Sequence, residues 1–253
     1  MTPSRLRWGA LAWLATLQFF VVETVVQFRG QGHSRLDDVI SDLGETTWPG
    51  HQAMNASFVV QGALILGGTL LLLPALRSGA GRTATYLLGA AAIGTLVVGV
   101  FPSDRSDTWH GVGAVLYLVG SAVGLICLAY ALRPRSEVLG TVLVLLGLVG
   151  AAATTFFVAE VDVLARGATE RAAAYVLPIG LALTGIVLGW TRTTDPAEAA
   201  EARRQRAERA RERDEALEAA ARRTEAGTTG APGSGPVDDA DAEDHWAPVR
   251  RTD

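Results

Sequence analysis

Six long apolar segments follow one another through residues 1–191, separated by short polar stretches. A helix needs about 20 apolar residues to cross the hydrocarbon core, and each segment is close to that length. We expect helices, because every backbone polar group must be satisfied inside lipid and no segment shows the alternation of a barrel strand. The pattern predicts an all-α, six-helix transmembrane bundle. Its predicted spans are Trp8–Phe28, Asn55–Leu76, Thr83–Phe101, Trp109–Leu132, Val138–Glu160 and Arg171–Thr191.

The hydropathy pattern changes after residue 191, where the chain becomes polar and charged. Ala, Glu and Arg dominate residues 192–226, which predicts a charged cytoplasmic helix following the six-span domain 1–191. Leu217 is nearly its only large apolar residue, so no coiled-coil seam is expected. A Gly/Pro/Ser run and an acidic block predict a disordered tail over 227–253. This C-terminal part is a candidate contact for a cytoplasmic partner or for anionic lipid headgroups.

The first apolar segment is predicted to be a retained helix. Arg5 and Arg7 precede it, as basic residues precede a secretory signal. Glu23 and Gln27 interrupt it, however, and no A-x-A cleavage site follows.

Arginines in the short loops give the expected orientation. Six lie on one predicted side and five on the other, and Arg192 with the arginines of the tail favours cytoplasmic N- and C-termini. We therefore expect a multi-pass protein of the cell membrane, in contact with membrane lipids.

The charge and cysteine content exclude several classes of protein. The net charge is −4, and residues 1–191 hold 11 Arg against 11 acidic residues, so no nucleic-acid-binding surface is expected. Cys127 is the single cysteine, so the chain has neither a disulfide framework nor a cysteine zinc site. No cofactor is predicted.

Small residues and one proline predict how the helices pack. Gly120 with Gly124, and Gly185 with Gly189, have the spacing that lets helix backbones approach closely, and we expect them to pack inside the bundle. Pro178 lies inside the last span. It removes the donor for the carbonyl of Ala174, so a kink is expected there.

Acidic residues and histidines gather at the end of the spans that is predicted to face outward. Spacing puts His51 with Asn55, and Arg171 with Tyr175, on common helix faces. A carboxylate within an apolar span is costly, so Glu23 and Glu160 are expected to face the interior, to pair with Arg166 or Arg171, or to stay protonated. The candidate ligand pocket comprises Glu23, Ser41, Asp42, His51, Asn55, Asp104, His110, Glu160, Glu170, Arg171 and Tyr175.

The same residues allow other interpretations. They could form a structural network of ion pairs and hydrogen bonds that fixes the helix ends. Three histidines with carboxylates are suitable zinc ligands, here His33, His51 and His110 with Asp42 and Asp104, although no close ligand spacing is present. A Ser-His-Asp arrangement could be composed from Ser41 or Ser103, His110 and Asp104, without a G-x-S-x-G elbow.

The order of these loop motifs resembles the membrane family catalogued as domain of unknown function 998. The resemblance covers about residues 8–191 and rests on residues 40–44 (ISDLG), His51 followed by residues 54–58 (MNASF), Phe101-Pro102 with His110-Gly111, and Glu170-Arg171 with Tyr175. Members commonly have a longer stretch, often with cysteines, where this chain has only Glu45–Gly50, and many place proline directly after the tyrosine. The resemblance implies a bacterial or archaeal integral membrane protein without an assigned activity.

Three functions remain open from the sequence. The first is binding or transport of a small polar solute or lipid headgroup, with Glu23, Glu160 and Arg171 as charged lining. The second is a non-catalytic membrane scaffold. The third is a membrane-embedded hydrolase that uses Asp42, Asp104, His51 and His110 for proton transfer or metal binding.

Overall fold

The computed structural model describes residues 2–161, 163–190 and 196–228. Within these residues six helices are long and apolar enough to span a membrane, and no strand occurs, which confirms the all-α prediction. The first span consists of two helices, α1 and α2. The bounds are α1 Pro3–Ala15, α2 Gln18–Gln27, α3 His51–Leu72, α4 Gly79–Val100, α5 Asp107–Leu132, α6 Glu137–Val158 and α7 Arg166–Trp190.

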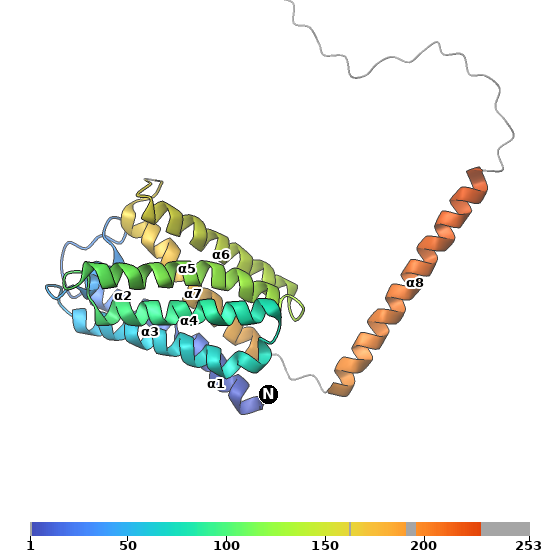
Figure 1. Ribbon diagram of the computed structural model, residues 1–253, viewed down its shortest axis with the longest axis horizontal. Helices are drawn as coiled ribbons and strands as arrows, with labels where there is room; N and C mark the ends of the chain where they lie inside the picture. Colours follow the sequence, from blue (N-terminus) through green and yellow to red (C-terminus); the bar gives the residue numbers. More distant parts are fainter. Residues whose placement is uncertain (1, 162, 191–195, 229–253) are drawn as a thin grey trace, which may run out of the picture. The chain divides into compact units, whose positions relative to one another are not determined.

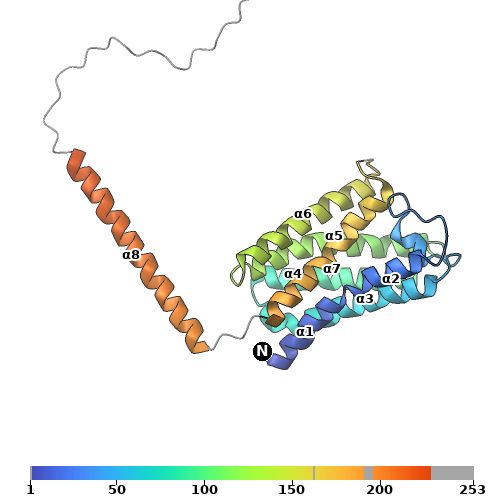
Figure 2. The same cartoon turned by 180° about the vertical axis from the view of Figure 1, so that it is seen from behind.

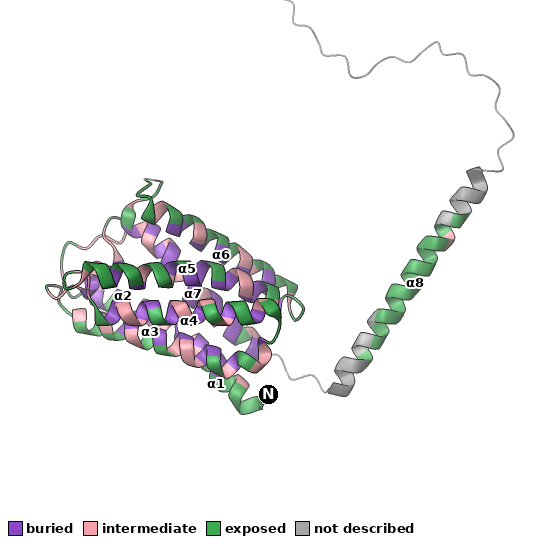
Figure 3. Cartoon of the chain, in the orientation of Figure 1, coloured by how far each residue is buried: buried purple, intermediate pink, exposed green. Residues whose placement is uncertain are grey.

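The six spans form a closed ring in chain order (Figure 1). Each packs on the next in antiparallel fashion, and the ring closes because α1 contacts both α3 and α7 (Figure 2). Helix α7 also contacts α5, and it is the most buried of the spans. Many large apolar side chains, such as Val115 and Leu148, are exposed on the outside of the ring, as expected where a protein meets lipid (Figure 3).

The first span is interrupted, unlike the single helix predicted for it. Between α1 and α2 the backbone N–H groups of Thr16 and Leu17 donate to the carbonyls of Trp13 and Leu14, three residues back, at 3.3 and 3.2 Å. The Thr16 hydroxyl donates to the same Trp13 carbonyl at 2.6 Å, which competes with the regular α-helical bond. A hydrogen-bonding side chain therefore accounts for a break that contains neither glycine nor proline.

All six spans begin earlier than predicted, and for two of them the earlier start changes the position of candidate site residues. Helix α3 starts at His51, and α7 starts at Arg166, so Glu170, Arg171 and Tyr175 all belong to one helix. The loop between α2 and α3 contains a short 3₁₀ helix, η1 (Ile40–Gly44), and a second one, η2 (Leu73–Ala75), extends α3.

The glycines pack inside the bundle, which confirms the prediction. A Cβ atom on Gly120 would lie 2.8 Å from the Leu87 carbonyl oxygen of α4, and one on Gly185 would lie 2.5 Å from the Ala10 carbonyl oxygen of α1. Both positions are therefore points of close backbone approach between neighbouring spans.

Pro178 lies inside α7 as predicted, and its effect on the hydrogen bonding is compensated by another helix. The carbonyl of Ala174, which would normally bond the N–H of residue 178, accepts a hydrogen bond of 2.9 Å from the hydroxyl of Tyr117 in α5.

A second unit of the chain, residues 193–253, contains helix α8 (Pro196–Thr228). Residues 196–226 of the predicted charged helix belong to α8, and residues 192–195 lie outside the described residues. Nearly all of its described side chains are exposed, Leu217 among them (Figure 3). Most of the predicted disordered tail, from residue 229 onward, lies outside the described residues.

Substitution of Tyr117 tests the compensation for Pro178. We expect Tyr117→Phe to lower the free energy of unfolding by about 1 kcal/mol, because the Ala174 carbonyl loses its donor inside the membrane. In a Pro178→Ala background the new N–H can bond that carbonyl, so the same substitution should cost clearly less. Thermal unfolding of the four proteins in detergent measures the coupling. Equal costs in both backgrounds would contradict this account.

Candidate ligand-binding site

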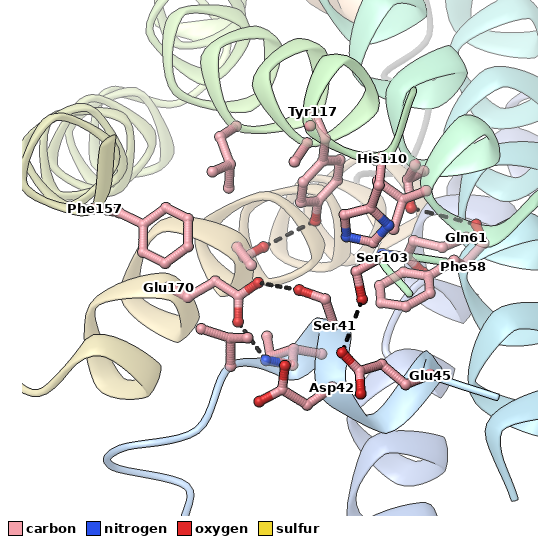
Figure 4. Close-up of a pocket in the computed structure, with 18 of the residues that line it drawn as sticks. Ser41, Asp42, Glu45, Phe58, Gln61, Ser103, His110, Tyr117, Phe157 and Glu170 are labelled. Atoms are coloured by element: carbon pink, nitrogen blue, oxygen red, sulfur yellow. Dashed lines mark hydrogen bonds between the residues drawn. The ribbon is translucent and has the colours of Figure 1, made fainter. Parts of the chain in front are cut away.

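A cavity of about 320 Å³ lies at one end of the bundle, which we call the pocket end: α2, α4 and α6 finish there, and α3, α5 and α7 begin. Its walls come from all six spans, from η1 and from loop residues beside them (Figure 4). The lining is apolar on the span side and polar at the rim. It comprises Phe19, Val39, Ile40, Ser41, Asp42, Glu45, Phe58, Gln61, Thr95, Val98, Ser103, Asp107, His110, Gly111, Ala114, Tyr117, Leu118, Phe157, Arg166, Glu170 and Ala174.

Helix η1 lies over the cavity and is fixed from two sides. The Glu170 carboxylate accepts a short hydrogen bond from the backbone N–H of Ile40 and a second bond, 3.3 Å long, from the Ser41 hydroxyl. From the other side, the Asn55 amide donates to the Gly44 carbonyl at 2.8 Å. The ISDLG segment is thereby held between α7 and α3.

The rest of the rim is built from the loop between α4 and α5. The Ser103 hydroxyl donates to Glu45 at 3.3 Å, and the Nδ1 atom of His110 lies 2.9 Å from the Phe101 carbonyl. Asp104 accepts hydrogen bonds from the backbone and the hydroxyl of Thr46, and these bonds hold its pKa below the usual value. Burial instead raises the pKa of Asp42.

A second polar group lies at the pocket end outside this cavity. We call it the Arg171 clasp, and it comprises Glu23, His33, Arg35, Arg171 and Tyr175. Glu23 is fully buried and Arg171 is 5% exposed. Their side chains form an ion pair of 2.9 Å, and the Tyr175 hydroxyl donates to the other Glu23 oxygen at 2.6 Å. Arg35 lies 3.5 Å from the same carboxylate.

Arg171 also binds the loop that precedes η1. Its Nη1 group donates to the carbonyls of Arg35 at 2.8 Å and Asp38 at 2.7 Å, and its Nη2 group lies 3.1 Å from the Nε2 atom of His33. A Cβ atom on Gly167 would nearly overlap the Asp38 carbonyl, so only glycine lets this loop lie against α7. The clasp joins α2, α7 and the loop.

The eleven residues predicted for one pocket separate into several groups. Ser41, Asp42, His110 and Glu170 line the cavity. Glu23, Arg171 and Tyr175 belong to the clasp and do not line it, contrary to the expectation that Glu23 and Arg171 form its charged wall. Asn55 fixes η1, and the Nδ1 atom of His51 lies 2.9 Å from the Trp48 carbonyl at the start of α3. Asp104 is exposed beside Thr46.

Glu160 was expected to face the interior or to find a partner, but it is exposed. It follows the end of α6 with a positive φ of 52° and borders a separate cleft with Phe156 and Leu164. Because α6 ends at Val158, Glu160 lies outside the apolar span, where a carboxylate is solvated at little cost.

The predicted catalytic and metal arrangements are not assembled. Ser41 bonds Glu170 and Ser103 bonds Glu45, while His110 bonds a backbone carbonyl and Asp104 bonds Thr46. With neither serine do these side chains form a Ser-His-Asp relay. Among the described residues, no group of three or more His, Cys, Asp or Glu side chains is placed to hold a metal ion.

The deep polar side chains of the cavity, those of Gln61, Thr95 and Tyr117, were not predicted from the sequence. The sequence contains an indication of Gln61, because Gln61 and Gln18 are polar residues within apolar spans, where such residues usually face the bundle interior. The Gln18 amide donates to the Gln61 oxygen at 3.3 Å, which links α2 to α3.

The fold and this site define an all-α multi-pass membrane protein with a cavity at one end of its bundle. The chain belongs to the family described as "Protein of unknown function (DUF998)", whose model matches residues 13–187. The resemblance noted from the loop motifs is thus confirmed. No curated protein and no solved structure matches the chain.

The clasp should make stability depend on pH through His33. Its side chain is 2% exposed, and burial followed by the nearby Arg171 lowers its pKa below 6.5, despite the opposing charges of Asp38, Asp42 and Glu23. Because the pKa of His33 is lower in the folded state than in the unfolded state, its contribution to stability is fully present above pH 6.5. This contribution is lost as the pH falls through the folded-state pKa of His33.

We expect the melting temperature in detergent to fall between pH 7.5 and 5.5, a range of about one unit on either side of 6.5. His33→Gln should flatten this part of the curve, because its amide oxygen can accept from Arg171 without titrating. If the variant and the wild-type protein lose stability equally over this range, His33 is not the responsible group.

Proposed function

We propose that this protein binds a small amphiphilic ligand in the cavity at the pocket end, with the polar head of the ligand at the rim and its apolar part between the spans. The observation that carries the proposal is the composition of one cavity. Its span side is lined by apolar groups such as Phe58, Leu118 and Phe157, whereas its rim holds Ser41, Asp42 and other polar side chains.

The depth of the cavity supports an amphiphile rather than a fully polar solute. The rim residues lie in loops or in the first turns of helices, where a spanning helix leaves the hydrocarbon core. The remaining lining extends into the spans, to Gln61 in α3 and Tyr117 in α5. A volume of about 320 Å³ is at the lower end of ordinary ligand sites.

The Arg171 clasp is proposed to support this site without touching the ligand. Its donors and acceptors already bind one another or the loop backbone, so little capacity remains for a further partner. We assign it the task of holding the loop before η1, and through η1 the rim of the cavity.

We further propose that the protein resides in the cell membrane with both termini in the cytoplasm. The arginines of the short loops and of the chain after residue 191 support this orientation. The cavity would then open to the extracytoplasmic side and take its ligand from there or from the outer leaflet.

Native mass spectrometry of the purified protein tests ligand binding without assuming a ligand. We expect the wild-type protein to retain a bound small molecule or lipid, and Ala114→Phe to lose it, because the larger side chain fills the cavity. Val115→Phe is the matched control, since its side chain is exposed on the outside of the same helix. Identical adducts on all three proteins, or none on the wild type, would argue against the proposal.

Labelling of single cysteines tests the orientation. In a Cys127→Ala background, Arg105→Cys at the pocket end should react with a membrane-impermeant maleimide on intact cells. Arg77→Cys, exposed at the opposite end, should react only after the cells are lysed. The reverse pattern would show that the cavity opens to the cytoplasm.

A further inference from the structure

Gln61 is a buried side chain of the cavity whose hydrogen bonding is incomplete. It is 1% exposed, and its Nε2 group makes no hydrogen bond to a described residue. The orientation of its amide follows from Gln18, whose own amide is set by Ser57: the Gln18 Nε2 group donates to the Ser57 carbonyl at 3.3 Å, and the Ser57 hydroxyl donates to the Gln18 oxygen at 3.0 Å. Gln18 therefore presents its NH₂ group, at 3.3 Å, to the oxygen of Gln61. The Gln61 Nε2 group approaches the Tyr117 hydroxyl but makes no hydrogen bond of normal geometry to a described residue.

The hydroxyl groups that share the deep part of the cavity donate elsewhere. Thr95 donates to the Phe58 carbonyl at 3.3 Å, and Tyr117 donates to the Ala174 carbonyl at 2.9 Å. The deep part of the cavity thus offers an N–H donor, and a ligand would satisfy it with an acceptor oxygen.

The rim, in contrast, offers acceptors, so a ligand would have to supply donors there. Four carboxylates line it, those of Asp42, Glu45, Asp107 and Glu170, and none forms an ion pair with a described residue. Glu170 and Glu45 accept only from neutral donors, the Ile40 backbone and two serine hydroxyls. Arg166 is the cation of the lining, and its guanidinium lies over the Phe157 ring, 5.8 Å from the centroid.

His110 adds an acceptor to this rim. Its Nδ1 atom lies 2.9 Å from the Phe101 carbonyl, which can only accept, so Nδ1 carries a proton and, in the neutral imidazole, the Nε2 atom is the acceptor. In the described part of the chain, this Nε2 atom has no hydrogen-bond donor.

We infer that the ligand is a cationic amphiphile, with an ammonium group bound among the rim carboxylates and a hydrogen-bond-accepting oxygen bound by Gln61. This inference rests on the proposed function and specifies its ligand class. The ammonium supplies the donors that the carboxylates and the His110 Nε2 atom can accept, and the chain between the two polar groups lies against Phe58 and Leu118.

The distance between the rim and Gln61 sets the length of the ligand. Gln61 lies six residues beyond Asn55, which bonds the end of η1, and this corresponds to about 9 Å along α3 at a rise of 1.5 Å per residue. An extended hexyl chain has about this length. An ω-methoxyhexylamine therefore serves as a defined probe with an ammonium at one end and an ether oxygen at the other.

Titration calorimetry in nanodiscs, with empty nanodiscs as reference, can test both ends of the probe separately. ω-Methoxyhexanol replaces the ammonium by a neutral hydroxyl, and n-octylamine replaces the ether oxygen by a methylene. We expect the wild-type protein to bind the methoxy amine about tenfold more tightly than either analogue, the size of effect that one charge-assisted or buried hydrogen bond gives.

Two variants assign each preference to its residue. Glu170→Gln should abolish the preference for amine over alcohol and keep the preference for ether over methylene. Gln61→Met should do the reverse. Asp107→Asn, at an exposed position of the rim, should also reduce the preference for amine over alcohol. This variant replaces Glu170→Gln in the test if Glu170→Gln does not fold.

Equal binding of amine and alcohol by the wild-type protein would overturn the inference, and so would an amine preference that survives both carboxylate substitutions. Ala114→Phe separates this failure from failure of the proposed function. If that variant binds all three probes as the wild type does, the cavity is not the binding site. If it loses them while the wild type prefers the alcohol, the cavity binds ligands and only the cationic class is wrong.

Discussion

The burial of Glu23 is the constraint on which the pocket end depends. A carboxylate with no exposed surface inside a membrane span is tolerated only when a partner compensates for its lost hydration. Arg171 supplies that partner at 2.9 Å, and its remaining N–H groups reach the carbonyls of Arg35 and Asp38. The same ion pair therefore joins α2 to α7 and fixes the loop that leads into η1. Because η1 covers the cavity, the shape of the proposed site follows from an interaction outside it.

Adjacent residues of α7 belong to two different polar systems. Glu170 points into the cavity and holds η1, while Arg171 points to Glu23, since neighbouring residues of a helix face different directions. In the clasp, nearly every strong donor and acceptor is satisfied within the protein, which is typical of a structural network. At the rim, the carboxylates accept only from neutral groups, and Gln61 beneath them has an unused donor. This difference in hydrogen-bond satisfaction is the physical basis for assigning a structural role to the clasp and a binding role to the cavity.

Several features could be predicted because each depends on a local property of the chain. Span length and hydropathy predict six helices, since a lipid environment leaves the backbone few alternatives. The sites of close packing at Gly120 and Gly185, and the freed carbonyl before Pro178, follow from the chemistry of single residues. The order of the loop motifs, from residues 40–44 (ISDLG) to Glu170-Arg171 with Tyr175, carried enough information to suggest the family that the family model confirms. The donor that replaces the helical bond at Ala174 was not predictable, because Tyr117 comes from another helix.

The sequence by itself determined that the chain is an all-α membrane protein and that, within residues 1–191, most acidic residues and the histidines lie near one end of the spans. Only the tertiary structure decided which of them meet: Glu23 pairs with Arg171, Glu160 is exposed, and Asn55 binds backbone instead of lining the cavity. The spans are apolar on nearly every face, so hydropathy does not fix their rotation about their own axes. That rotation comes from packing around the closed ring of helices, and it turned Gln61 and Tyr117 into the cavity. Which polar groups share a site is therefore a property of the assembled bundle.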